Sequence, residues 1–189
     1  MADRRVQKTK NLIEDVLINL LETKNINTIT VTEVCKLADI NRGTFYLHYA
    51  DVFDLFEQLQ SELLNDFYQI LNKYEIVEST LDKSFPILTD IAIFVKEKSK
   101  FFKIFLNKNN IDFNRNLTDK FLEYLKYKSW IKFYHSDDNL ITYEYYYTFI
   151  ITGIIGIITK WLNSGLKESC TEIADMMEEF CLTGFESII

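Results

Sequence analysis

Residues 28–55 carry two helix-start signals only eleven positions apart, and this spacing constrains the fold more than any other feature of the chain. Thr30 and Glu33 form a Ser/Thr-x-x-Glu capping box, in which each side chain can accept a hydrogen bond from the backbone N–H of the other. Asn41 is a good N-cap for a second helix over about 42–48. The segment therefore predicts two short helices joined by a tight turn.

The turn between these helices needs one residue in a left-handed conformation, and Asp39 adopts it at a lower cost than most residues other than glycine. The second helix is predicted to bury Phe45 and to expose small and polar groups. Asp51 can cap a third, longer helix that begins near Val52. Such a pair of short helices places the second one in the major groove of DNA, so residues 1–51 are predicted to form a helix-turn-helix DNA-binding domain.

Over residues 29–51 the pattern is Ile-Thr-Val-x-x-Val-x-x-x-Ala-x-Ile-Asn-x-Gly-Thr-Phe-Tyr-x-His-Tyr-x-Asp, which resembles the DNA-binding domain of the TetR/AcrR family of bacterial repressors. The run from Gly43 to Tyr49 is the most specific part, and the close match covers about residues 8–57. Two positions depart from the family's usual pattern. Asp39 stands where the family has glycine, and Val52 stands where it has a lysine that meets a phosphate, so one phosphate contact is expected to be missing.

The DNA contacts are assigned to the exposed side of the motif. Arg42 and Thr44 would approach base edges, whereas Tyr46 and His48 would meet phosphates. The predicted DNA-binding residues are Arg4, Arg5, Lys8, Thr32, Lys36, Arg42, Gly43, Thr44, Tyr46 and His48. The first three precede or begin a helix predicted over about 6–23, and they form either a solvated tail or an arm that contacts the DNA backbone.

The net charge of −7 is at first sight unfavourable for DNA binding. Residues 1–50 hold seven Lys/Arg and six Asp/Glu, hence +1, whereas residues 51–189 hold fourteen and twenty-two, hence −8. Even +1 is low for a domain that neutralises phosphates. We therefore expect modest non-specific binding and a strong dependence on dimerisation.

Five glycines and one proline leave few breaks in 189 residues, which favours long helices. We expect an all-α fold of about nine helices, three in the DNA-binding domain and six in an effector-binding and dimerisation bundle over 52–189. The helices predicted there are 52–74, 86–98, 101–106, 117–133, 140–163 and 170–188, with a loop at 107–116. The polar N-terminus is unlike a signal peptide, and the most apolar run, 148–159, is shorter than the ~20 residues of a spanning helix, so a soluble cytoplasmic protein without a membrane partner is expected.

The run from Tyr146 to Gly165 is similar to the C-terminal region of a TetR-like subgroup, with the pattern aromatic-x-x-x-Gly-x-x-Gly-x-x-x-x-Trp-Leu-x-x-Gly. Gly153 and Gly156 form a flat strip that another helix can approach closely, either within the subunit or, as the resemblance implies, in a homodimer formed through 145–163 and 170–188. A two-fold dimer would place two recognition helices ~34 Å apart. The predicted interface residues are Gly153, Gly156, Ile157, Lys160, Trp161, Met177, Phe180 and Cys181.

Aromatic residues gather in the C-terminal part, where 25 of the 28 lie beyond residue 50. The resemblance implies a pocket for an unknown small-molecule effector, and core packing is the alternative role for most of these side chains. The predicted pocket residues are Phe94, Phe102, Phe105, Phe121, Tyr124, Tyr127, Trp130 and Tyr146.

Two other classes of function compete with a DNA-binding regulator. A helical protein-interaction adaptor with a decayed DNA-binding domain would account for Val52 and the low positive charge. An enzyme would need a nucleophile–base pair, a metal cluster or a phosphate loop, and the sequence offers none of these, so we expect no catalysis, no metal and no cofactor. The leading prediction is a dimeric repressor that binds a (pseudo)palindromic double-stranded DNA operator and is released by a small-molecule effector.

Overall fold

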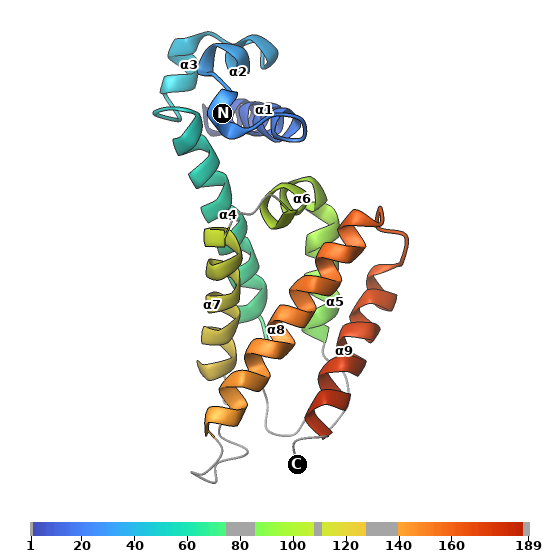
Figure 1. Ribbon diagram of the computed structural model, residues 1–189. Coiled ribbons are helices and arrows are strands. Elements are labelled where there is room, and N and C mark those ends of the chain that lie inside the picture. The colour runs from blue at the N-terminus through green and yellow to red at the C-terminus, as the bar shows by residue number, and fades with distance from the viewer. Residues whose placement is uncertain (1, 75–85, 108–110, 128–139, 187–189) are drawn as a thin grey trace. The chain divides into compact units, whose positions relative to one another are not determined.

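The computed structural model describes residues 2–74, 86–107, 111–127 and 140–186. Within these ranges the chain folds into nine α-helices and one short 3₁₀ helix and contains no strand (Figure 1). The predicted all-α class with about nine helices is therefore confirmed for the described residues. The chain divides into two compact units, Met1–Leu63 and Leu64–Ile189. The boundary falls within helix α4 (Val52–Asn72).

The first unit contains α1 (Ala2–Leu21), the 3₁₀ helix η1 (Ile26–Thr28), α2 (Val31–Leu37), α3 (Arg42–Tyr46) and the first part of α4. Apolar side chains from each α-helix meet in one core, because the apolar residues of each helix recur every three to four positions. Leu17, Val34, Phe45 and Leu55 are completely buried in this core.

Local capping explains where the motif helices begin. The Thr30 hydroxyl accepts from the Glu33 N–H at 3.2 Å, as the capping box predicts. The other half of the box differs from the prediction, because the Glu33 carboxylate pairs with Lys24. Asn41 caps α3 by accepting from the Thr44 N–H at 2.8 Å.

The turn between α2 and α3 contains the expected left-handed residue. Asp39 has φ = 51°, and the next N–H, that of Ile40, donates to the Cys35 carbonyl at 3.0 Å. This bond closes the end of α2 in the manner of a Schellman cap, in which glycine is usual. The fold therefore keeps a turn that favours glycine, with an aspartate in the strained position.

The start of α1 corrects one expectation about the N-terminus. The helix begins at Ala2, so Arg4 and Arg5 lie inside its first turns, whereas the sequence placed them before the helix. The helix therefore fixes the positions of both arginines. The two alternatives are now a helical surface that is only solvated and a helical surface that contacts the DNA backbone.

The second unit contains the rest of α4 with α5 (Pro86–Glu97), α6 (Ser99–Asn107), α7 (Ile111–Tyr127), α8 (Leu140–Asn163) and α9 (Cys170–Glu186). The central helix is α8, which contacts α5, α6, α7 and α9, and Figure 1 shows it between α7 and α9. The capping box that opens α9 is complete. The Ser169 N–H donates to the Glu172 carboxylate at 2.8 Å, and the Glu172 N–H donates to the Ser169 hydroxyl at 3.1 Å.

The start of α7 is a second correction, because residues 111–116 were predicted to be loop and are helical. Phe113 is buried there, with its ring centroid 5.1 Å from that of Phe105 on α6. Asp112 in the first turn also suits the helix dipole. A tertiary contact thus overrides the low helix propensity of the Asn- and Asp-rich segment. The predicted continuation of this helix, 128–133, lies outside the described residues.

Helix α8 contains a long apolar segment. By length and composition, Tyr145–Asn163 within α8 would be able to cross a membrane. About 39% of this window is buried inside the second unit, however, and the core helix of a soluble domain passes the same test. Four other helices of the unit contact α8, so one side of it belongs to the core, whereas Tyr145 and Phe149 are exposed.

Candidate DNA-binding site

The short helix α3 buries one side and exposes the other. Phe45 and Tyr49 are buried, with ring centroids 5.7 Å apart, and they hold the helix against the first unit's core. On the other side Arg42, Gly43 and Tyr46 are exposed. The second helix of the motif therefore presents a continuous surface to solvent, as a recognition helix must.

The N-terminus of α3 is held by Asn41. Its side-chain oxygen accepts from the Thr44 N–H and also from the Thr44 hydroxyl, at 3.2 Å. A Cβ at Gly43 would lie 3.1 Å from the same oxygen, which is tighter than an ordinary contact. Glycine at position 43 thus leaves room for the cap and lets the backbone come close to a neighbouring surface.

Arg42 and Tyr46 form a pair along the exposed side of α3. The Arg42 Nη2 donates to the Tyr46 hydroxyl at 3.0 Å, and the guanidinium carbon lies 5.7 Å from the Tyr46 ring centroid. The hydrogen bond to Tyr46 is the main reason why the pKa of Arg42 is raised. This pair places a fixed positive charge and a phenol side by side on the surface, a combination suited to phosphate contacts.

A partly buried polar contact anchors the end of α3. The Tyr49 hydroxyl donates to the Glu14 carboxylate of α1 at 2.8 Å, and the Lys10 ammonium lies 5.8 Å from the Tyr49 ring centroid. Lys10 in turn pairs with Glu62 of α4 at 3.4 Å. Burial is the largest cause of the raised pKa of Glu14 and of Tyr49. Side chains from α1 and α4 therefore converge on Tyr49, three residues after the end of α3.

All ten predicted DNA-binding residues belong to the first unit, and none of them is buried. Eight are exposed, on α1, α2 and α3, and two are partly exposed. The exposed residues are Arg4, Arg5, Lys8, Thr32, Lys36, Arg42, Gly43 and Tyr46, and the partly exposed ones are Thr44 and His48.

The sequence did not identify Leu47 as a surface residue of the site. Its side chain is 81% exposed directly after α3, although leucine is usually buried. Leu47 follows Gly43 by four residues and Thr44 by three. This spacing was the signal that would have placed it on the same side of α3 as those two residues.

The surroundings of position 52 disfavour the binding of a DNA phosphate more strongly than the sequence indicated. Val52 is only 4% exposed, so the residue that replaces the family's lysine is part of the core. Two carboxylates also close the N-terminus of α4. Asp51 accepts from the Asp54 N–H at 2.9 Å, and Asp54 accepts from the Ala50 N–H at 2.7 Å. Bonds from Gln58, first, and from Ala50 lower the pKa of Asp54, which keeps its negative charge at this end of the helix.

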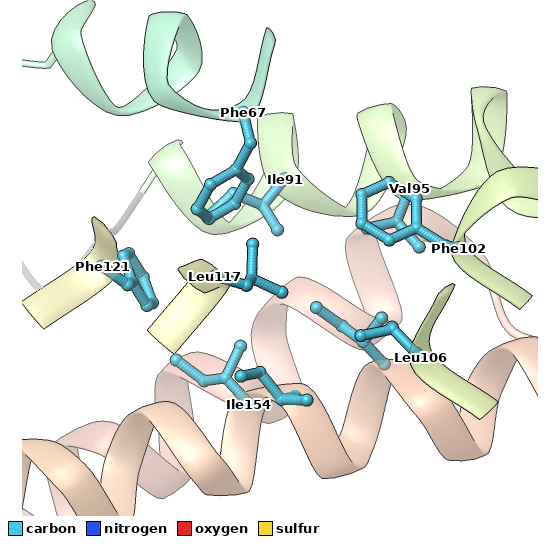
Figure 2. Close-up of a pocket in the computed structure, with 10 residues that line it drawn as sticks. Phe67, Ile91, Val95, Phe102, Leu106, Leu117, Phe121 and Ile154 are labelled. Carbon is cyan, nitrogen blue, oxygen red and sulfur yellow. The ribbon is translucent and has the colours of Figure 1, made fainter. Parts of the chain in front are cut away.

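The second unit contains a narrow apolar cavity between α4, α5, α6, α7 and α8 (Figure 2). The space that the centre of a water molecule can reach inside it is about 20 Å³. That is room for about one or two water molecules. All the side chains around it are apolar, and they are Phe67, Ile91, Val95, Phe102, Leu106, Leu117, Phe121, Ile154, Ile155 and Ile158.

Of the predicted pocket residues whose side chains the structure describes, only Phe102 and Phe121 line this cavity. Four others are buried elsewhere in the unit, and they are Phe94, Phe105, Tyr124 and Tyr146. The two buried tyrosines use their hydroxyls as donors to backbone carbonyls, at 3.4 Å to Tyr74 and at 2.7 Å to Cys181, respectively. The side chain of Tyr127 and the whole of Trp130 lie outside the described residues.

The predicted interface residues of α8 and α9 divide into two groups. Trp161 and Met177 are buried in the core of the subunit, so they have almost no surface left for a second copy. The Trp161 indole N–H donates to the Glu168 carbonyl at 3.1 Å, which fixes the end of α8. The others are exposed or partly exposed, and they are Gly153, Gly156, Ile157, Lys160, Phe180 and Cys181.

A short capped helix that follows another short helix through a tight turn, with one face buried and one face exposed, is a helix-turn-helix, the motif that many DNA-binding transcriptional regulators use. A family model described as "Transcriptional regulator C-terminal region", of the TetR type, matches residues 82–182. That range is more than half of the chain. This chain therefore belongs to the TetR family of transcriptional regulators. The family expected from residues 29–51 is confirmed by this match to the C-terminal part of the chain.

Individual relatives agree with this assignment. The chain is 26% identical over 113 residues to the HTH-type transcriptional regulator YxbF of Bacillus subtilis, a match that covers 58% of this chain and 29% of that protein. It is 30% identical over 56 residues to the HTH-type transcriptional regulator AcrR of Shigella flexneri, covering 30% of this chain and 26% of that protein. The matched segments thus span less than a third of the length of either relative.

Solved structures support the fold. A TetR-family regulator from Syntrophomonas wolfei superimposes with a TM-score of 0.69 and 15% sequence identity, over 94% of each chain. At this level of identity the likeness concerns the arrangement of the helices.

Proposed function

We propose that this protein is a cytoplasmic, dimeric repressor that binds a (pseudo)palindromic DNA operator and is released from it by a small-molecule effector. The observation that carries the proposal is the exposed face of α3, which is fixed at its start by Asn41 and just beyond its end by Tyr49. A reading helix held at both ends loses little conformational freedom on binding, and this favours affinity.

The electrostatics of the site make the dimer essential to the proposal. The acidic N-terminus of α4 and the buried Val52 leave phosphate binding to Tyr46, His48 and the basic residues of α1 and α2. Arg42, which the sequence assigned to base edges, joins them because it is paired with Tyr46. With few charges in each copy, two copies on one operator are needed to neutralise enough phosphates. Two-fold symmetry would also match the symmetry of a palindromic site.

The proposed dimer uses the exposed side of α8 and α9. An added Cβ at Gly153 or Gly156 would have no atom within 4 Å, so packing inside the subunit does not account for these glycines. Phe149 and Phe180 are 69% and 54% exposed on the same two helices. Exposed aromatic side chains on helices that also carry a strip without side chains are typical of a surface that another helix covers.

The proposed effector is apolar, because the cavity of the second unit has no polar side chain in its wall. It is too narrow for an organic molecule without a rearrangement, so ligand entry must move the surrounding helices apart. One wall residue, Phe67, belongs to α4. This helix begins at Val52, six positions after α3 ends at Tyr46. A ligand that displaces Phe67 would move α4, and this is the coupling that release from DNA requires.

The test is the binding of the full-length protein to the DNA upstream of its own gene, measured by fluorescence anisotropy at several salt concentrations. Lys36→Gln should lower the slope of log K against log salt by about two, because each copy of the dimer loses one phosphate contact. Lys167→Gln, which removes an exposed lysine from the loop after α8, is the matched control and should leave the slope unchanged.

Binding that does not depend on salt, or equal slopes for the two lysine variants, would overturn the proposal. A Tyr46→Ala variant separates the adaptor alternative from the repressor, since an adaptor would keep its activity without the DNA-facing tyrosine.

A further inference from the structure

The reading face of α3 extends beyond the helix to Leu47. The Leu47 N–H donates to the Gly43 carbonyl at 3.2 Å, so the backbone keeps its helical course at this residue. Gly43, Thr44 and Leu47 are spaced so that they share one side, and we call them the reading stripe. Phe45 and Tyr49 occupy the opposite, buried side.

Leu47 is the most exposed large apolar side chain in the described part of the chain, at 81%. It does not belong to a loose segment, because the Tyr49 hydroxyl two residues later is bonded to Glu14. The chain thus holds the Leu47 side chain in solvent at a fixed position. Exposure of this apolar surface does not stabilise the protein, whereas its burial against an apolar group would stabilise a complex.

The polar groups beside the reading stripe already have partners. Arg42, which would be able to read guanine, donates to Tyr46 and lies against its ring. The single hydroxyl hydrogen of Thr44 is donated to Asn41. The reading stripe itself has no charged side chain, so it offers no bidentate hydrogen-bonding group to a base edge.

We propose that the reading stripe recognises thymine through its C5-methyl group, with Leu47 as the specificity-determining residue. The C5-methyl of thymine is the distinctive apolar group that an unmodified base pair presents in the major groove, so an apolar stripe is complementary to it. Each operator half-site then carries a thymine at the base pair that faces Leu47. This inference rests on the proposed function, since it requires α3 to enter the major groove.

The experiment begins with duplexes selected by the full-length protein from a library of random double-stranded DNA. Each thymine of the selected half-site is then replaced, one at a time, by deoxyuridine, which removes only the methyl group. Burial of one methyl predicts that this change weakens binding of the wild type about fourfold at one position in each half-site. Leu47→Ala should bind the thymine and deoxyuridine duplexes equally at that position.

Leu37→Ala is the matched control, because Leu37 is also an exposed leucine, at 57%, but ends α2 and does not belong to the reading stripe. It should keep the fourfold preference, and circular dichroism of both variants checks that the helices are intact. An unchanged thymine preference in Leu47→Ala, or selected sites with no sensitivity to deoxyuridine, overturns this inference and leaves the proposed function standing. Failure to select any DNA sequence overturns both.

Discussion

Replacing Gly153 and Gly156 by alanine tests the proposed dimer through the sign of a free-energy change. In a helix interior, alanine is more favourable than glycine by about 1 kcal/mol. Neither added Cβ would meet an atom of its own subunit within 4 Å, so nothing inside the subunit opposes this gain. The double variant should therefore raise the free energy of unfolding of the isolated subunit by about 2 kcal/mol.

The dimer should respond in the opposite direction. If α8 of one copy lies against a helix of the other through the glycine strip, four added methyl groups per dimer must fit where backbones now touch. Overpacking of this kind costs about 1–3 kcal/mol, which is roughly a 5-fold to 150-fold loss of dimer affinity. Sedimentation velocity over a range of protein concentrations measures the dimer affinity, and urea unfolding at a low concentration measures the subunit.

Asn116→Ala supplies the control for helix propensity. Asn116 is exposed on α7, so this change should stabilise the subunit by about 0.6 kcal/mol without altering dimer affinity. A double glycine variant that is more stable and dimerises as well as the wild type would remove the strip from the interface. A variant whose isolated subunit is less stable would refute the reasoning about open space around the two glycines.

Three further predictions concern stability. Asp39→Gly should raise the melting temperature by about 2 °C in a calorimetric scan, because glycine has no penalty at φ = 51°, and Asp39→Ala should lower it. Burial raises the pKa of Glu14 above 4.5, so its protonated form favours folding, and the stability that it contributes is lost as the pH rises from 4.5 through that raised pKa. Glu14→Gln, which can still accept from Tyr49, should therefore gain stability over the wild type in urea unfolding at pH 8 and not at pH 4; an equal gain at both pH values would contradict this assignment. Ser169→Ala should lower the free energy of unfolding by about 1 kcal/mol through loss of the α9 cap, and an unchanged urea midpoint would show that the cap is dispensable.

Local signals were predicted well because their physics is local. The caps at Thr30 and Asn41 depend on residues within three positions, so the sequence alone shows both donor and acceptor. The left-handed turn at Asp39 was predictable for the same reason, since the end of one helix and the start of the next leave it no other conformation.

Contacts between distant residues were not predictable in this way. The buried Phe113 extends α7 into a segment whose composition is typical of a loop, and its partner Phe105 lies on another helix. Glu33 pairs with Lys24 although the capping box assigned its carboxylate elsewhere. The cavity wall mostly consists of aliphatic residues from several helices, so a count of aromatic residues identified only Phe102 and Phe121.

The sequence by itself determined the helical class, the positions of the motif helices and the family. Caps, turns and periodic apolar patterns depend on residues only a few positions apart, so they can be recognised without the fold. Only the tertiary structure decided which side chains remain at the surface. It buried Val52 and Trp161, held Leu47 outward and left Gly153 without a neighbour. The reason is physical: exposure depends on what other helices cover, and residues far apart in the sequence supply that cover.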